Sequence, residues 1–315
     1  MVQEPFFSVV IPLYNKERDI EHTIQSVLKQ EFTSFELIIV NDGSTDSGLE
    51  VVNSIVDDRL FCYTIKNSGP SIARNFGVEK AKSEYIVFLD ADDIWYPQHL
   101  KKLKQLINNK YEVSWYCTGY EYMLEGKSTY PMNVSLMLDS KNSYGVCDYF
   151  ENSLSDSLVS TSSVCLKKEF FMMLGGFNPK YDTGQDTDLW IRAGLVSQLA
   201  YINRITVVVN LQGSNRITDM PILSKRHLQF DDHLNVEEDR LPFRKFMNFY
   251  RYNHYLKFKM AGFEENAQVY LVNLDAQMLN RKQRFLLKIP GRILRAIYDF
   301  KSKLYKYGIR LRASN

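Results

Sequence analysis

The stretch Glu36–Asp46 reads ELIIVNDGSTD, in which the apolar residues LIIV are followed at once by a polar turn. Two further runs have the same form, Phe7–Ile11 (FSVVI) and Tyr85–Leu89 (YIVFL), and Leu60–Ile65 is a weaker fourth. Apolar residues at successive positions are typical of strands buried on both faces of a parallel sheet. Helical patterns separate these runs, so the first hundred residues predict an α/β fold with a mostly parallel central sheet flanked by helices.

The helical patterns lie between the predicted strands. They cover Glu17–Gln30 and about Ser47–Val56, and a third helix begins near Pro70, whose fixed φ suits the first helical turn. Further along, the predicted elements are strands at Tyr111–Tyr120, Ser163–Leu166 and Ile205–Val209 and a helix at Asp186–Leu195. After Pro221 the sequence predicts helices almost throughout, including the aromatic-rich segment Phe243–Phe263.

Composition excludes several classes of protein. The chain has 315 residues, 45% of them apolar and 24% charged, which is typical of a globular protein with a large core and not of a disordered chain. No run approaches the ~18 apolar residues of a membrane-spanning helix, and the N-terminus shows no secretory signal. The four cysteines are widely separated, which argues against a disulfide framework or a zinc cluster and predicts a cytoplasmic protein.

The charge is distributed unevenly along the chain. Residues 281–315 contain eleven Lys and Arg but a single acid, Asp299, whereas the remaining residues carry 28 basic and 36 acidic side chains. A mildly acidic body is not the profile of a nucleic-acid-binding protein, so no nucleic-acid partner is expected. The basic tail requires a separate explanation.

Polar residues follow each of the three strong strands. They are Pro12, Tyr14, Asn15 and Glu17 after the first, Asn41–Asp46 after the second and Asp90–Asp93 after the third. Ligands of open α/β sheets bind outside the carboxyl ends of the strands. We therefore expect all three sets to converge on one rim of the sheet.

Asp90 and Asp92 are two residues apart, so on an extended chain both side chains address one site. Two such carboxylates repel each other unless a cation compensates, and Mg²⁺ or Mn²⁺ shared with a substrate phosphate would do so. The alternative interpretation is a polar turn or helix cap, a role that Asp93 also fits.

A glycine-containing turn, Asn67–Pro70, precedes a predicted helix that contains Arg74. Free backbone N–H groups at a helix N-terminus favour anions, and Arg74 lies one turn in, within reach of a phosphate or nucleotide. The alternative is an ordinary ion pair with a surface acid. The chain has no Gly-x-Gly-x-x-Gly after the first strand and no Gly-Lys-Ser/Thr loop, which disfavours a dinucleotide site and a P-loop.

Six motifs in order resemble those of family 2 glycosyltransferases, inverting enzymes of the GT-A fold. They are SVVIPLYNKE (8–17), VNDGSTD (40–46), NSGPSIARNFG (67–77), FLDADDIW (88–95), GGF (175–177) and QDTDLWIR (185–192). The resemblance covers roughly residues 6–215. It is closest to members that build bacterial surface polysaccharides, including capsules and exopolysaccharides.

The resemblance implies a role for each matching position. Pro12, Tyr14 and Glu17 line the nucleotide-binding edge, Asp42 accepts a hydrogen bond from a pyrimidine N3–H, and Arg74 is a further nucleotide contact. Asp90 and Asp92 form the DxD element, with Asp92 the direct ligand of the metal and Asp90 nearer the ribose. Asp186 is implied to be the catalytic base.

The role of Asp186 also has a physical rationale. An inverting transfer is one in-line displacement at the anomeric carbon, and it requires a base on the acceptor side to take the hydroxyl proton. An Asp at a helix N-terminus stays ionised because the helix dipole favours its charge. The alternative is that Asp186 merely caps its helix.

Two departures from the family pattern are visible. Gln185 stands directly before the expected base, where the family usually has an acidic residue, and this alters the surroundings of the base. The stretch Asn210–Arg216 lacks the Arg-x-His pattern of many relatives, although Arg216 remains a candidate contact for the diphosphate.

The basic tail carries one apolar stripe at spacings of three and four residues. Its members are Leu286, Ile289, Ile293, Ile297, Phe300, Leu304, Tyr307 and Leu311, and Pro290-Gly291 is expected to interrupt the helix. Such a stripe with basic flanks is typical of a helix that lies on an anionic membrane. The competing interpretations are a dimerising helix, giving a homodimer, and a helix that docks on the chain's own acidic body.

Together these observations predict a metal-assisted glycosyltransferase that uses Mn²⁺ or Mg²⁺ and a nucleoside-diphosphate sugar, with a glycan or polyprenyl-linked glycan as acceptor. The expected organisation is a catalytic domain at 1–218, a helical subdomain at 219–280 and the tail at 281–315. The expected location is the cytoplasm, peripheral on the inner membrane face. The alternative is an inactive nucleotide-sugar or glycan-binding protein of the same fold.

Overall fold

The computed structural model describes residues 4–124, 128–134, 136, 143–230, 236 and 239–306. Tyr307 and Leu311 of the predicted tail stripe lie outside these residues. The chain divides into two compact units, residues 1–228 and residues 229–315.

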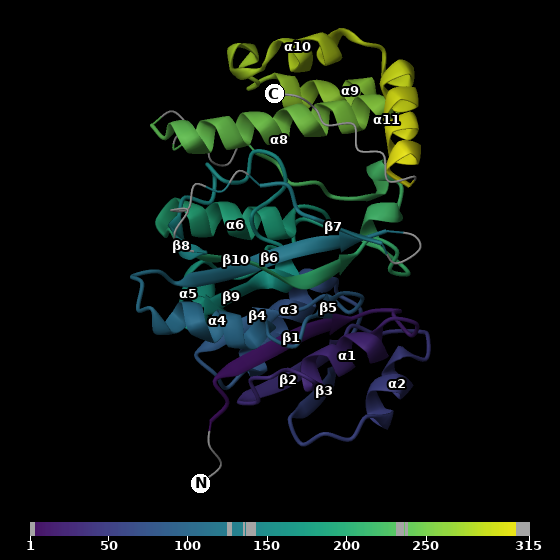
Figure 1. Ribbon diagram of the computed structural model, residues 1–315. Helices are drawn as coiled ribbons and strands as arrows, with labels where there is room; N and C mark the ends of the chain where they lie inside the picture. The colour runs from purple at the N-terminus through teal and green to yellow at the C-terminus, as the bar shows by residue number, and fades with distance from the viewer. Residues whose placement is uncertain are drawn as a thin grey trace. The chain divides into compact units, whose positions relative to one another are not determined.

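The first unit is built on one mixed sheet (Figure 1). Among the described residues its strands are β1 (Phe7–Leu13), β2 (Phe35–Asn41), β3 (Leu60–Thr64), β4 (Tyr85–Phe88), β5 (Ile94–Trp95), β6 (Trp115–Met123), β7 (Thr129–Pro131), β8 (Tyr144–Cys147), β9 (Val164–Lys167) and β10 (Leu199–Asn210). They are ordered β3-β2-β1-β4-β9-β6-β10-β5, with β7 beside β6 and β8 beside β10. The first four are parallel to one another, as are β6 and β10, while β9 is antiparallel to both of its neighbours. The predicted α/β fold is confirmed.

Helices cover both faces of this sheet. They are α1 (Ile20–Leu28), α2 (Gly48–Ser54), α3 (Pro70–Lys80), α4 (His99–Asn108), α5 (Lys168–Met173) and α6 (Gln185–Val196). The apolar faces of α1, α2 and α4 join one core with alternate residues of the strands, Val9 and Ile11 of β1 among them. On the opposite face α3 packs on β1 and β2, and Trp190 of α6 stacks on Trp115 of β6.

Close contact of α3 with the sheet depends on Gly77. A Cβ at this position would lie 2.4 Å from Cγ1 of Val10, well inside van der Waals contact. Any larger residue would push the helix away from β1 and β2. The contact matters because α3 begins at the rim where the parallel strands end.

The second unit is helical in its described residues. Its elements are α8 (Leu241–Met260), α9 (Glu264–Gln268), the short 3₁₀ helices η6 (Val269–Leu271) and η7 (Ala276–Met278), α10 (Arg281–Lys288) and α11 (Gly291–Lys306). The aromatic-rich segment forms the core of this unit: Phe246 contacts Tyr250, and Phe258 contacts Tyr270. Pro290 separates α10 from α11, as the sequence predicts. None of the described helices is both long and apolar enough to cross a membrane.

The structure extends or adds elements in the middle of the first unit. Strand β10 starts six residues before the predicted Ile205, because its first part pairs with β6 and β8 across an irregular register. Strands β5, β7 and β8 and helices α4 and α5 are not predicted from the sequence. The three strands are two to four residues long, too short for an alternating pattern to show.

Candidate active site

Hydrogen bonds connect the loop after β1 with the loop after β2. Asn15 accepts a hydrogen bond from the Thr45 amide at 2.7 Å, and Glu17 accepts one from the Ser47 amide at 3.1 Å. Asn15 has φ of 51°, a left-handed conformation that asparagine tolerates better than most residues. Glu17 therefore has a partner in the neighbouring loop, while Tyr14 on the same loop is exposed.

Asp42, at the end of β2, lies buried beneath the N-terminus of α3. Its two carboxyl oxygens accept hydrogen bonds from the backbone amides of Ser68, at 2.7 Å, and Gly69, at 2.8 Å. Burial raises the pKa of the Asp42 carboxyl, and the two backbone hydrogen bonds lower it in part. Each oxygen retains a second lone pair, so the carboxylate can also accept a hydrogen bond from a ligand.

Arg74 lies one turn into α3 and is buried, with Nη2 at 2.5 Å from Oδ1 of Asp90. The guanidinium carbon lies 5.0 Å from the centre of the Phe177 ring. Within the part of the chain that the structure describes, Nε and Nη1 of Arg74 are buried without a hydrogen-bond partner. A buried guanidinium with unused donors is suited to bind an anion.

Asp92 is held by a lysine that sequence reasoning did not single out. Nζ of Lys16 lies 2.6 Å from Oδ2 of Asp92 and also donates to the carbonyl oxygen of Ser214. Burial raises the pKa of Asp92, the Lys16 charge lowers it, and the charges of Asp90 and Asp19 raise it. The quoted motif SVVIPLYNKE contains Lys16, but one lysine in a loop gives no signal of its partner.

Asp93 fixes the loop that carries the two preceding aspartates. Its carboxylate accepts hydrogen bonds from the Ser162 hydroxyl at 2.5 Å and from the Asn210 amide at 2.9 Å. The Ser162 hydroxyl in turn accepts from the amide of Asp90 at 3.1 Å. The pKa of Asp93 lies well above the usual range because the group is fully buried and close to Asp90 and Asp92. Asp93 thus has a structural role, the alternative that the sequence analysis allowed for it.

Asp186 occupies the first turn of α6, after the left-handed Gly184. Its carboxylate accepts a hydrogen bond from the amide of Thr187 at 2.7 Å. Burial raises the pKa of Asp186, the positive charge of Arg74 lowers it and the negative charge of Asp90 raises it. Since the charges of Arg74 and Asp90 both act on Asp186, the N-terminus of α6 lies at the same rim as α3 and the loop after β4.

The motifs around Asn75 and Phe177 explain how α6 reaches that rim. The Asn75 side chain donates to the Phe177 carbonyl at 2.8 Å and accepts from the Phe177 amide at 2.9 Å. Arg192 of α6 donates to the carbonyl oxygens of Leu174 and Gly176 and pairs with Asp188. These hydrogen bonds and this ion pair connect α3, the turn before α6 and α6 itself.

The predicted convergence is thus visible in part. Asp90, Arg74 and Asp186 interact through their charges, and Asp42 lies at the N-terminus of the helix that carries Arg74. Pro12 is half-buried within β1, where it pairs with Val40. Gln185, at the first position of α6, has a buried Oε1 for which the described residues provide no hydrogen-bond partner.

The donor groups around Asp92 fit a divalent cation that is shared with a ligand. Asp92 and the Ser214 carbonyl already converge on one cationic atom, Nζ of Lys16, and oxygen atoms of these kinds are ligands for Mg²⁺ and Mn²⁺. No group of three or more His, Cys, Asp and Glu that could hold a metal ion occurs among the described residues. A metal at Asp92 would therefore complete its coordination with substrate phosphate and water.

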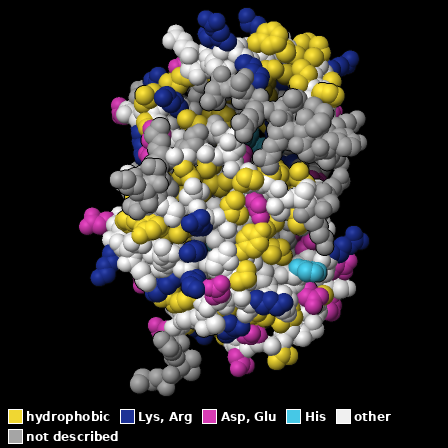
Figure 2. Space-filling model, viewed as in Figure 1, with side chains coloured by type: hydrophobic (Ala, Val, Ile, Leu, Met, Phe, Trp, Pro, Cys, Tyr) yellow, Lys and Arg dark blue, Asp and Glu magenta, His cyan; other side chains and the backbone are white. Residues whose placement is uncertain are grey.

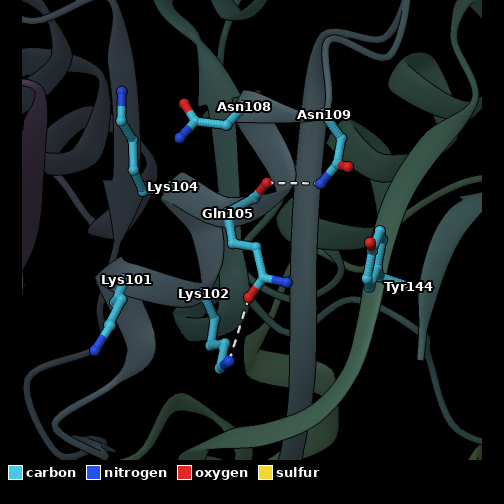
Figure 3. A pocket seen from close by; sticks show the side chains of 7 residues that line it. All are labelled: Lys101, Lys102, Lys104, Gln105, Asn108, Asn109 and Tyr144. Carbon is cyan, nitrogen blue, oxygen red and sulfur yellow. Dashed lines mark hydrogen bonds between the residues drawn. The ribbon is translucent and has the colours of Figure 1, made fainter. Parts of the chain in front are cut away.

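A pocket of 460 Å³ beside α4 does not belong to this site (Figure 3). It is lined by Lys101, Lys102, Lys104, Gln105, Asn108 and Asn109 of α4 and by Tyr144 of β8. Lys101 pairs with Glu31, and the ammonium of Lys104 lies over the Phe6 ring. Lys102 donates to the side-chain oxygen of Gln105 at 3.2 Å, so each of the three lysines has a partner within the protein.

Part of the chain also matches a known protein family. Residues 8–156 match the sequence profile of the family described as Glycosyl transferase family 2. These residues form a family 2 glycosyltransferase domain. The matched part contains Asp42, Arg74, Asp90 and Asp92, whereas Asp186 lies beyond it.

Relatives of this glycosyltransferase domain share part of the chain. An uncharacterized glycosyltransferase of Haemophilus influenzae is 43% identical over 102 residues, which are 31% of this chain and 40% of the relative. The putative teichuronic acid biosynthesis glycosyltransferase TuaG of Bacillus subtilis is 29% identical over 192 residues, 60% of this chain and 71% of TuaG. The chain spans 31% to 40% of the length of three of its curated relatives.

The crystal structure of Staphylococcus aureus TarS 1–349 in complex with UDP-GlcNAc has the same fold. It superposes with a TM-score of 0.63 at 17% identity, over 97% of this chain and 93% of TarS 1–349. At this identity the likeness concerns the fold alone, and it confirms the predicted GT-A architecture.

Proposed function

We propose that the protein is an inverting glycosyltransferase that moves a sugar from a nucleoside-diphosphate sugar to a hydroxyl group of a glycan or lipid-linked glycan. The observation that supports this most directly is the position of Asp186, a carboxylate in the first turn of α6 whose pKa responds to Arg74 and Asp90. This supports Asp186 as a base for the acceptor hydroxyl, close to the groups that suit a donor phosphate.

Each side chain then has a task in the transfer. Asp186 accepts the proton of the acceptor hydroxyl as its oxygen attacks the anomeric carbon, a role that typically contributes ~10²–10⁴ in rate. Arg74 binds the donor through its unused N–H groups, and Asp90 holds the guanidinium in place while contacting the ribose. The N-terminal turn of α3 adds a positive dipole on the same side.

Asp42 selects the nucleotide base of the donor. Its carboxylate accepts the N3–H of uracil or thymine on the lone pairs that Ser68 and Gly69 leave unused. Pro12, Tyr14 and Glu17 form the edge of the nucleotide site. The pyrimidine contact at Asp42 implies a UDP- or dTDP-linked donor, and the UDP-GlcNAc complex of TarS supports the uridine nucleotide.

Asp92 would hold the divalent ion, Mn²⁺ or Mg²⁺, which would supply positive charge to the departing diphosphate. Asp93 keeps this loop in place through Ser162 and Asn210. Arg216 donates to the Leu211 carbonyl at 2.6 Å and lies in the loop that contacts Lys16, which agrees with a role near the diphosphate.

The C-terminal helices support a membrane-bound acceptor. Ile293, Ile297 and Phe300 of α11 are each about half exposed or more, and Phe285 of α10 is exposed as well. Figure 2 shows hydrophobic side chains on these helices with Lys and Arg beside them. Exposed apolar residues flanked by basic ones suit an anionic lipid surface, where a polyprenyl-linked glycan would be presented. TuaG, which is named for teichuronic acid biosynthesis, supports a surface polysaccharide as the product.

The test is a screen of UDP-, dTDP- and GDP-sugars with Mn²⁺, by thermal stabilisation and by release of nucleoside diphosphate. A ligand that binds only the native state raises the melting temperature, so a true donor stabilises and is consumed. If a nucleotide sugar stabilises the protein but is neither transferred nor slowly hydrolysed, the second candidate is favoured, an inactive nucleotide-sugar-binding protein. A folded protein that none of the nucleotides stabilises would contradict both.

A further inference from the structure

The ion pair between Lys16 and Asp92 is largely buried. The Lys16 side chain is 12% exposed and that of Asp92 is 11% exposed, with 2.6 Å between Nζ and Oδ2. Lys16 comes from the loop after β1 and Asp92 from the loop after β4, so the contact joins two segments of the rim. A charge pair with so little solvent around it is screened weakly.

The loop 211–216 encloses the same carboxyl oxygen from another side. A Cβ on Gly213 would lie 2.0 Å from Oδ2 of Asp92, so the backbone of Gly213 passes directly over this atom. The next residue, Ser214, gives its carbonyl oxygen to Lys16 and donates its amide and hydroxyl to Asp19. Lys16 thus holds both Asp92 and the loop that covers it.

We propose that Lys16 is a tethered cation that competes with the divalent ion for Oδ2 of Asp92, and so makes binding of the ion depend on the donor. This inference rests on the proposed function. An ion arriving alone gains one carboxylate and must displace the ammonium from Asp92 and from the Ser214 carbonyl. An ion arriving with a diphosphate brings phosphate ligands that offset the displacement.

The charges around Asp92 argue against a merely structural ion pair. Asp90 lies two residues from Asp92, and Asp19 accepts hydrogen bonds from the amide and hydroxyl of Ser214 in the covering loop, so two further carboxylates lie near the one that Lys16 holds. Without the ammonium, the same carboxylates would attract any available cation more strongly. If Lys16 competes with the ion, removing its charge should increase the affinity for the metal. The loss of a merely structural ion pair would not increase that affinity.

The experiment is a titration with Mn²⁺ followed by electron paramagnetic resonance, on the full chain and in the absence of nucleotide. Lys16→Met is expected to lower the dissociation constant for Mn²⁺ about tenfold, and Lys16→Gln to do the same although its amide can still donate to Ser214. Lys16→Arg, which keeps the charge, is expected to bind Mn²⁺ like the wild type. The matched control is Lys29→Met, which removes the same charge from an exposed site at the end of α1.

The titration is repeated with UDP present. The wild type is expected to bind Mn²⁺ more tightly with UDP than without it, and Lys16→Met to show a smaller difference. Unchanged or weaker Mn²⁺ binding by the two neutral variants without UDP, with melting temperatures like the wild type's, would overturn the inference. If Mn²⁺ binding tightens but the wild type transfers no sugar, only the proposed function fails; if transfer requires Mn²⁺ and binding does not tighten, only this inference fails.

Discussion

Arg74 and Asp90, on α3 and in the loop after β4, form an ion pair with 2.5 Å between Nη2 and Oδ1. Ser68 and Gly69, directly before this helix, donate their amides to Asp42, and the charge of Arg74 acts on Asp186 at the start of α6. Helix α3 therefore connects three acidic residues that are far apart in the sequence. Gly77 allows this helix to pack closely on β1 and β2.

Arg74→Met is expected to weaken UDP binding about tenfold, because the donor loses a charge-assisted hydrogen bond from a buried guanidinium. Isothermal titration with UDP and Mn²⁺ measures this. Arg59→Met is the control, since Arg59 pairs with Asp57 at 2.8 Å in a different part of the unit. Equal UDP affinity in the Arg74 variant and the wild type would remove Arg74 from the donor site.

Asp186→Asn is expected to lower the rate of sugar transfer about 10²–10⁴-fold while leaving UDP affinity within about twofold, because the amide cannot take the acceptor proton. Asp182→Asn, which removes a carboxylate paired with Arg226 three residues before α6, serves as the control. Burial raises the pKa of Asp186, so the ionised carboxylate costs stability near neutral pH, and the variant should melt no lower than the wild type. Full transfer by Asp186→Asn would show that another group is the base.

The rate of sugar transfer should depend on pH through the ionisation of Asp186. A general base works in its deprotonated form, so kcat/KM should rise with pH through the pKa of this carboxyl, which burial places above the ordinary aspartate value. The positive charge of Arg74 lowers this pKa, so Arg74→Met should move the acidic limb to higher pH. A limb that stays in place in Arg74→Met and persists in Asp186→Asn would contradict the assignment.

The sequence supports the parallel half of the sheet well, because β1, β2 and β4 are apolar on successive residues and each ends in a polar turn. The strand ends also predict the position of Asp42, Asp90 and Asp92 on one rim. Pro70 begins its helix where its fixed φ indicates. Local pattern and global fold agree in these segments.

The rest depends on contacts that no local pattern encodes. The pairing of Lys16 with Asp92 joins residues 76 positions apart, and that of Asp93 with Asn210 joins residues 117 positions apart. Strand β9 is inserted antiparallel between β4 and β6, which its four residues alone do not reveal. Such relationships arise from tertiary packing.

Gly77→Ala should destabilise the first unit by about 1–3 kcal/mol, the usual cost of overpacking a well-filled core. The added methyl group would lie 2.4 Å from Val10, whose branched side chain has little freedom to move. Lys80→Ala, at an exposed position of the same helix, is the control. Chemical denaturation measures both variants, and equal stability of Gly77→Ala and the wild type would contradict the close packing of α3.

The last prediction concerns the basic tail. Ile293→Glu combined with Ile297→Glu is expected to abolish co-sedimentation with vesicles that contain anionic lipid, because both residues are about half exposed on α11 and acidic residues would be repelled by the surface. Val272→Glu is the matched control, since this valine is exposed in the second unit outside α10 and α11.

Melting temperature and molar mass in solution, measured for each variant, separate the competing roles of the tail. Loss of a dimer with unchanged vesicle binding would favour the dimerising helix, and loss of stability alone would favour a helix docked on the chain itself. Selective loss of vesicle binding with unchanged folding would support the membrane surface as the place where the acceptor is met.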